Sequence, residues 1–135
     1  MKEIINDKGA ILAVVVRGND WPESLHFHTN DEDFLQVGTW NYPKGKKSST
    51  HSHKIAERIT NRTNEAIYVR QGKLEASIYS EEDSLLKKVT LGEGDMILIF
   101  GGGHSFEALE DRTKVLEIKN GPYPGMEKDK RDIAV

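Results

Sequence analysis

The stretch EAIYVRQGKLEASIY at residues 65–79 decides the fold class of this chain. Two runs that contain β-branched and aromatic residues, 65–70 and 73–79, lie on either side of Gln71-Gly72. Runs of this kind are typical of β-strands, and a two-residue connection with glycine is typical of a tight turn. The stretch therefore predicts a β-hairpin with strands at 65–70 and 73–79.

Short apolar or alternating runs recur along the chain, each bounded by turn residues. Strands are predicted for these runs at residues 11–16, 34–42, 49–55, 87–91, 96–100, 105–109 and 115–119. Eight or nine short strands with frequent turns predict an all-β sandwich, jelly roll or barrel. No long segment shows helical periodicity, and only residues 126–130 suggest a short helical turn. The polar segment 56–64 is either a long loop or an additional strand.

The composition indicates one domain of 135 residues, which is long enough to bury a core. A formal net charge of −3 and the lack of a basic cluster with interleaved aromatic residues disfavour a nucleic-acid partner. The absence of cysteine excludes disulfides, thiolate metal sites and cysteine nucleophiles. No signal peptide is visible, and the longest apolar run, residues 10–16, is too short to span a bilayer. We therefore expect a soluble, cytoplasmic domain without a membrane partner.

Three of the five histidines form one constellation, which is His51-Ser52-His53, a glutamate, and His104. Residues i and i+2 of an extended segment point to the same face, so His51 and His53 can act together. His104 follows three glycines, which permit a turn that aims its side chain inward. Imidazole nitrogens with one carboxylate and open positions suit Fe(II), Mn, Ni, Cu or Zn better than Mg or Ca. We expect one divalent transition metal ion at this site.

Two glutamates compete for the carboxylate position of the expected metal site. Glu65 opens a strand in which Ile67 and Val69 should face the core, so Glu65 should face inward too. Glu57 lies in the irregular segment 56–64, where a solvated glutamate is the simpler interpretation. Glu65 is therefore the predicted metal ligand, and Glu57, if it does not bind the metal, is the candidate general base. Ligation by both glutamates, or by the three histidines with water, stays open.

The spacing of these residues resembles the first sequence motif of the cupin superfamily. Gly45, five residues and His51-Ser52-His53 match its first half, and Glu65, six residues and Gly72 match its second half. Eleven residues separate the two halves, where the family has three or four.

A second cupin motif is similar to GDMILIFGGGH at residues 94–104. The chain departs from it in three ways: no proline precedes His104, the glycine-to-histidine spacing is one residue short, and Ala108 replaces the usual asparagine. The likeness covers residues 34–123 of a single domain, 1–135. The Gly-Gly-His-Ser-Phe-Glu segment and the ending VLEIKNGPY resemble small cupins encoded among surface-polysaccharide biosynthesis genes. The resemblance implies a double-stranded β-helix, a jelly-roll barrel of two antiparallel sheets with the metal inside its open end.

Other polar residues are candidates for contacts with a ligand. Gln36 shares one strand face with Trp40 and Tyr42; this face either lines the pocket, with Gln36 as a hydrogen-bond donor, or packs on a partner subunit. Arg58 and Arg62 lie in the insertion between the two half-motifs, and they are candidates for binding a phosphorylated or nucleotide-linked ligand.

The remaining expectations concern the chain's surface. The second histidine pair, His26-Phe27-His28, lacks the flanking spacing of a metal motif, so a solvated edge strand or loop is predicted. Because sheet edges must be covered, the amino-terminal strand and the Gly-Pro-Tyr-Pro segment are available to a second copy. We therefore expect a homodimer.

Two functions of different classes are compatible with these residues. In the first, the protein is a metal-dependent enzyme acting on a small polar molecule, most plausibly a sugar or nucleotide-sugar. A Zn, Ni, Mn or Fe ion would act as a Lewis acid in isomerase or epimerase chemistry. A non-haem iron dioxygenase is a variant of this hypothesis. In the second, the protein is a non-catalytic, metal-dependent carbohydrate-binding or sensor module.

Overall fold

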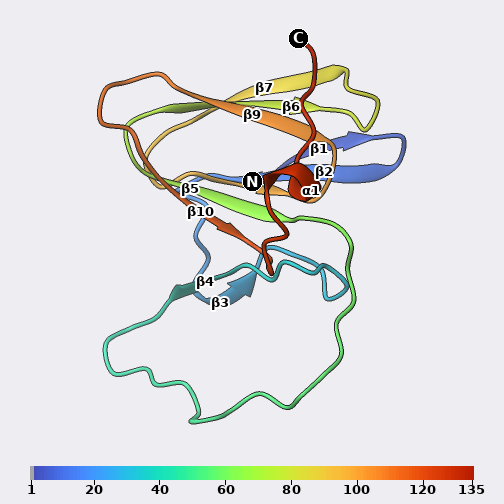
Figure 1. Cartoon of the computed structure of the whole chain (residues 1–135). Coiled ribbons are helices and arrows are strands. Elements are labelled where there is room, and N and C mark those ends of the chain that lie inside the picture. Colours follow the sequence, from blue (N-terminus) through green and yellow to red (C-terminus); the bar gives the residue numbers. More distant parts are fainter. Residues whose placement is uncertain (1) are drawn as a thin grey trace.

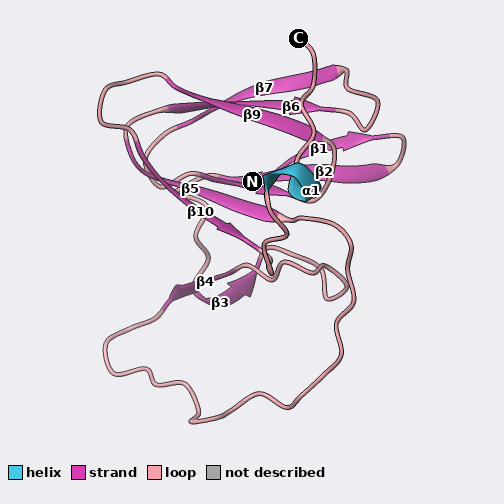
Figure 2. Cartoon of the chain, viewed as in Figure 1, coloured by secondary structure: helices cyan, strands magenta, loops and turns pink. Residues whose placement is uncertain are grey.

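Two antiparallel sheets pack face to face in the computed structural model, which describes residues 2–135 (Figures 1 and 2). The five-stranded sheet has the order β1 (Glu3–Asp7), β2 (Ala10–Val16), β8 (Met96–Ile99), β5 (Glu65–Gln71), β10 (Lys114–Lys119). The three-stranded sheet has the order β7 (Leu85–Leu91), β6 (Leu74–Tyr79), β9 (Gly103–Ala108). A hairpin of β3 (Ser24–Phe27) and β4 (Gly38–Asn41) and a short helix, α1 (Met126–Asp129), complete the described elements.

The main core lies between the two large sheets. Alternate residues of β5 and β2 point toward β6 and β7, and the largest side chains in this layer are almost fully buried. The apolar residues that fill the layer are Ile5, Ala13, Val15, Ile67, Val69, Leu74, Ala76, Ile78, Val89, Leu91, Ile97 and Ile99. These residues occur at every second position along each strand, because successive side chains of a strand point to opposite faces. Burial of this apolar face holds the two sheets together.

A smaller cluster lies on the other face of the five-stranded sheet. Val14, Val16 and Leu98 are buried there, and the segment around β3 and β4 covers them through Leu35 and Val37. The strands β2 and β8 are therefore buried on both faces, which explains why their sequences are continuous apolar runs rather than alternating ones.

The predicted hairpin across Gln71-Gly72 is wrong, although both of its strands exist. β5 already pairs with β8 on one side and β10 on the other, so it offers no free edge to β6. Gly72 instead carries the chain from one sheet to the other with φ +85°, and a Cβ on it would lie 2.5 Å from Thr113 Oγ1. A positive φ and such a close approach require glycine.

Most other strand predictions are confirmed within one or two residues, and the helical turn at 126–130 corresponds to α1. The prediction of a strand at 49–55 is wrong, because residues 42–64 contain no helix or strand. Ile55 is the only large apolar residue in 49–55 and is fully exposed, so this stretch has no apolar face to bury. Only residues 38–41 of the predicted strand 34–42 are a strand, and β1 and β3 were not predicted.

The all-β class is therefore confirmed, while the described sheets do not close into a barrel. Within residues 2–135, no helix has the length and apolar character needed to cross a membrane.

Candidate functional site

Glu65 and His104 meet at one end of the two packed sheets. Glu65 is the first residue of β5 in the five-stranded sheet, and His104 is the second residue of β9 in the three-stranded sheet. His104 Nε2 lies 2.8 Å from Glu65 Oε2, and the two side chains are 30 % and 6 % exposed. The expected inward parity of Glu65 with Ile67 and Val69 is confirmed, since Ile67 and Val69 belong to the core between the sheets while Ala66 and Tyr68 pack on the other face.

The turn before β9 positions His104. Gly102 has φ +70°, and a Cβ on it would overlap the carbonyl oxygen of Tyr79. A Cβ on Gly103 would overlap Ile133 of the C-terminal segment. The glycines at 102 and 103 thus let the chain turn tightly against β6. This turn places His104 at the end of the sandwich, and the triple glycine had predicted such a turn.

The Glu65 carboxylate is buried, and one of its oxygens has a single close partner. Within residues 2–135, His104 Nε2, at 2.8 Å, is the close partner of Oε2, and no other side chain completes this oxygen with a well-formed hydrogen bond. The His104 ring nevertheless lowers the pKa of the Glu65 carboxyl group, and this outweighs burial, which would raise it. A buried carboxylate oxygen with a single close partner is costly, so a cation or a ligand donor beside His104 would stabilise it further.

Two residues of β10 also face this end of the sandwich. Lys119 pairs with Glu65 in register and Glu117 pairs with Ile67, so both point to the inner face. His104 lowers the pKa of the Glu65 carboxyl group most. A hydrogen bond with the Glu117 side chain and the positive charge of Lys119 lower it further. The sequence hypothesis missed Glu117 and Lys119, although the alternation in Val115–Lys119 placed them on one face.

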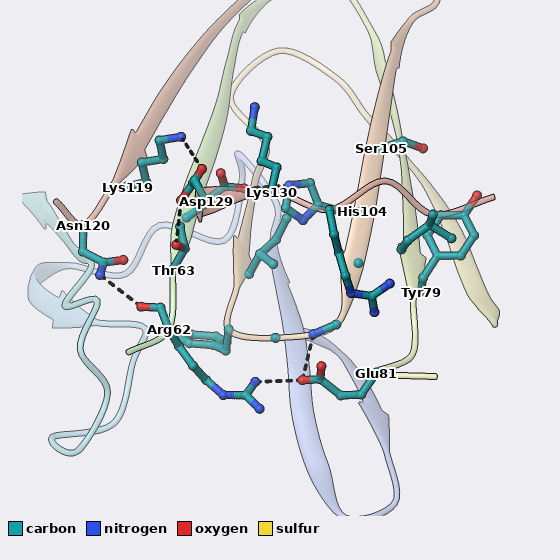
Figure 3. Close-up of a pocket in the computed structure, with 18 of the residues that line it drawn as sticks. Arg62, Thr63, Tyr79, Glu81, His104, Ser105, Lys119, Asn120, Asp129 and Lys130 are labelled. Atoms are coloured by element: carbon teal, nitrogen blue, oxygen red, sulfur yellow. Dashed lines mark hydrogen bonds and ion pairs between the residues drawn. The ribbon is translucent and has the colours of Figure 1, made fainter. Parts of the chain in front are cut away.

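A pocket of about 1090 Å³ opens at this site (Figure 3). Glu65, His104, Glu117 and Lys119 line it, together with Tyr79 and residues on its rim. Its volume lies just above the range of about 300–1,000 Å³ that is typical of small-molecule sites.

Ion pairs and hydrogen bonds organise one part of the rim. Arg62 Nη1 lies 2.7 Å from Glu81 Oε1, which also accepts a hydrogen bond from Gly102 N at 3.1 Å (Figure 3). Arg62 lowers the pKa of the Glu81 carboxyl group, and the Gly102 hydrogen bond acts in the same direction. Asn120 binds the same segment, donating to Arg62 O at 3.1 Å and accepting from Asn64 N at 2.7 Å.

The C-terminal segment forms another part of the rim. Asp129 in α1 lies 3.5 Å from Lys119 Nζ and accepts a hydrogen bond from Thr63 at 3.2 Å (Figure 3). Arg131 forms a bidentate ion pair with Asp83 at 2.8 and 2.9 Å. These contacts hold residues 129–133 over the pocket and leave a lining that is rich in hydrogen-bond donors and acceptors.

The structure does not bring His51 and His53 to Glu65 and His104. Both lie in the exposed segment between β4 and β5, outside the pocket lining, with ring centroids 5.2 Å apart. His51 Nδ1 contacts Ser49 O at 2.8 Å. Within residues 2–135, no three metal-binding side chains form a group that could hold an ion. Two of the four predicted ligands are thus adjacent, and two are not.

The other predicted site residues also lie outside the pocket. Glu57, the candidate base, and Arg58 are exposed in the same segment, where Arg58 Nη1 contacts Ala56 O at 3.3 Å. Gln36 is exposed and donates to Asn30 O and Asp33 O at 2.8 and 2.7 Å, so it stabilises its own loop. Arg62 is the predicted cation that does reach the pocket rim.

Neither models of protein families, nor curated proteins, nor solved structures give a match to this chain. Its chemistry must therefore be inferred from the site itself.

The donor set fits a divalent transition metal in part. Glu65 offers a carboxylate oxygen, His104 offers Nε2 beside it, and Glu117 offers a second carboxylate on the same inner face. Nitrogen and carboxylate oxygen donors suit Zn, Mn, Ni or Fe. Two close donors alone are fewer than the three or four protein ligands usual for such ions, so a complete centre needs further ligands.

Proposed function

We propose that the chain is a metal-dependent cupin-type protein that binds a small polar molecule in the pocket beside Glu65 and His104. A sugar or nucleotide-sugar is the proposed ligand, and isomerase or epimerase chemistry in surface-polysaccharide biosynthesis is the proposed role. The observation that carries the proposal is the buried Oε2 of Glu65, whose one close partner is His104 Nε2, in a large pocket.

Different residues of the pocket would have different roles in such a reaction. Glu65 and His104 would hold a divalent ion, which supplies Lewis acidity toward a sugar carbonyl or hydroxyl oxygen. Glu117 faces the same space and is the carboxyl group available for proton transfer, a role that Glu57 cannot fill from its present position. The donors of Arg62 and Asn120 on the rim can orient hydroxyl or phosphate oxygens.

A non-catalytic binding module is the second candidate. It is favoured by the pairing of the rim charges, because Arg62 is held by Glu81 and Lys119 by Asp129. Side chains held in ion pairs of this kind can orient a bound ligand by hydrogen bonds, and they are poorly suited to accept or donate protons in a reaction. Glu117 distinguishes the two candidates, since a catalyst requires a free acid–base residue and a binding module does not.

Metal content and affinity test the proposal first. Chelator-treated protein titrated with Zn²⁺ or Mn²⁺ should bind one ion per chain, measured by calorimetry and elemental analysis. Glu65→Gln and His104→Ala should each weaken binding by at least about 10-fold, because each removes a ligand. His26→Ala is the matched control, because His26 lies on the β3–β4 hairpin and outside the pocket. Equal affinity in all four proteins, or no ion bound, would overturn the proposal.

Chemistry is tested on the metal-loaded protein with a panel of nucleotide-sugars in D₂O. Isomerisation and epimerisation remove a carbon-bound proton, so deuterium should enter the ligand and be visible by NMR. Glu117→Gln should slow the exchange by about 10²–10⁴-fold with ligand affinity retained. Ligand binding without exchange would instead support the non-catalytic module.

A further inference from the structure

The C-terminal segment crosses one end of the sandwich beside the pocket. From β10 in the five-stranded sheet, the chain runs through α1 toward the three-stranded sheet (Figure 1). We call residues 126–135 the strap. Residues of the strap line the pocket together with Glu65 and His104. The strap is therefore one wall of the candidate site.

Few contacts hold the strap in this position. No residue in 126–135 is buried as a whole. Arg131 pairs with Asp83, but the two side chains are 67 % and 37 % exposed, and Ile133 packs against Gly103. Exposed ion pairs contribute little to stability, and segments that bury little apolar surface open at low cost. The strap can therefore leave the pocket while the two sheets stay folded.

One side chain of the strap is nevertheless well shielded. Only 8 % of the Asp129 side chain is exposed. Its Oδ2 lies 3.5 Å from Lys119 Nζ, and its Oδ1 accepts a hydrogen bond from Thr63 Oγ1 at 3.2 Å (Figure 3). The two oxygens of one anion thus meet a cation and a hydroxyl donor. A carboxylate or a phosphate of a bound ligand can make the same two contacts.

Lys119 connects this contact with the rest of the pocket. It pairs in register with Glu65, which lies beside His104, and all three residues line the pocket. An oxyanion held by Lys119 would therefore place the rest of a ligand next to Glu65 and His104. Glu65 and Glu117 disfavour a further negative charge here, so an incoming anion should replace Asp129 rather than join it. Such an exchange leaves the net charge of this corner unchanged.

We propose that Lys119 and Thr63 form an oxyanion subsite, which Asp129 occupies until the carboxylate or phosphate of a ligand displaces it together with the strap. The subsite deepens the proposed function, because it rests on the pocket binding a small polar molecule and adds that this molecule is anionic. It requires no metal ion. The tethered Asp129 competes at an effective concentration of about millimolar, so a ligand needs further contacts in the pocket to displace it.

Calorimetric titration of three probes tests the competition by Asp129. The probes are D-glucose, D-glucuronate and glucose 1-phosphate, at constant ionic strength so that screening is equal. Asp129→Asn should bind the two anionic sugars about 10-fold more tightly than the unchanged protein, because the competing charge is gone. Glu127→Gln removes the same charge from the same helix outside the pocket lining, and it should bind like the unchanged protein. Neither substitution should change the response to D-glucose.

A second pair of variants tests the cation. Lys119→Gln, added to Asp129→Asn, should weaken the binding of the anionic sugars at least about 10-fold, because it removes the charge that holds the oxyanion. Lys114→Gln in the same background is the matched control, since Lys114 lies on the same strand and outside the pocket lining. Tighter binding of D-glucuronate would identify a carboxylate ligand, and tighter binding of glucose 1-phosphate a phosphate ligand. Either result supports the subsite.

A cross-link tests whether the strap must move. The chain contains no cysteine, so Asp83→Cys/Arg131→Cys has two thiols only. A bismaleimide that joins them keeps the strap in place, whereas N-ethylmaleimide on each thiol leaves it free. The cross-linked form should bind the anionic sugars at least 10-fold more weakly than the capped form. Because both samples carry the same substitutions, any effect of these on folding cancels.

The outcomes separate the subsite from the metal site. Equal affinity of Asp129→Asn and the unchanged protein, or equal losses for Lys119→Gln and Lys114→Gln, would overturn the subsite. Equal binding by the cross-linked and capped forms would overturn displacement of the strap. Zn²⁺ binding through Glu65 and His104 without binding of the anionic sugars through Lys119 would overturn the subsite alone. Binding of these sugars by a protein that binds no Zn²⁺ would overturn the metal site and support the subsite.

Discussion

His28 lies buried behind the β3–β4 hairpin, with 4 % of its surface exposed and its Nδ1 without a hydrogen-bond partner among residues 2–135. Its Nε2 contacts Thr39 Oγ1 at 2.9 Å. The prediction of a solvated His26-Phe27-His28 stretch is therefore wrong for His28. Phe27 is 50 % exposed, so the parity of this stretch is opposite to the one that hydrophobicity alone favours.

We expect His28 to make the fold sensitive to mild acid. Burial lowers the pKa of the His28 imidazole, the charges of His26 and Lys2 act in the same direction, and Asp20 opposes them. The unfolded chain then binds a proton more readily than the folded one. Stability should be constant above about pH 6.5 and should fall as the pH drops from there toward the lower pKa of the folded state.

Urea denaturation between pH 5 and 8 measures this effect. In His28→Gln, the part of the pH dependence due to this imidazole should disappear, whereas His26→Gln serves as the less buried neighbour for comparison. If both variants kept the slope of the unchanged protein, His28 would not be the group responsible.

Among the elements, strand identity followed from sequence much better than strand partnership. Continuous apolar runs such as residues 11–16 and 96–100 mark strands because they are buried on both faces. Which strands pair depends on which strand edges already have a neighbour. The residues around Gln71-Gly72 contain no local pattern that indicates that β8 and β10 flank β5. The connection at Gly72 looked like a hairpin because hairpins and sheet-to-sheet crossovers both favour glycine.

The same limit applied to the site. The directions of the Glu65 and His104 side chains were predictable, because strand parity and the glycine turn fix them locally. The position of His51 and His53 depends on where the segment between β4 and β5 lies relative to the sheets, and no local sequence pattern fixes that tertiary arrangement. Glu117 was missed because β10 turns the apolar Leu116 and Ile118 outward and the charged Glu117 and Lys119 inward, against the usual pattern.

The crossover predicts a difference between two glycines of nearly equal φ. Gly9→Ala, at φ +81° with no atom within 4 Å of its Cβ position, should cost about 1 kcal/mol. Gly72→Ala, at φ +85°, must in addition displace Thr113, whose Oγ1 and Cα lie 2.5 and 2.8 Å from the new Cβ. It should cost about 1–3 kcal/mol more, since overpacking adds to the backbone strain.

Chemical denaturation of both variants compares these costs. Equal losses for Gly9→Ala and Gly72→Ala would show that β5 and β6 are not joined by a close crossover against Thr113. A hairpin between these strands would produce that result.

At the scale of the whole molecule, β10 is one of the described strands that lie at an exposed sheet edge. β10 is an edge of the five-stranded sheet, with Glu117 and Lys119 facing the pocket and Leu116 and Ile118 facing outward. Leu116 and Ile118 are 53 % and 52 % exposed. An edge strand with apolar residues on its outer face invites pairing with another chain unless it is covered.

We expect a second copy of the chain to cover β10, in a symmetric dimer in which each contact occurs twice. Light scattering coupled to size exclusion should show twice the mass of the chain at micromolar concentration. Leu116→Lys/Ile118→Lys should weaken the dimer at least about 10-fold, a change of about 1.4 kcal/mol. Leu85→Lys on β7, where Leu85 is 50 % exposed, is the matched control and should leave the dimer intact. Because Leu116 and Ile118 face away from the pocket, the double variant should still bind Zn²⁺. If the unchanged protein were a monomer at this concentration, the expected dimer would be contradicted.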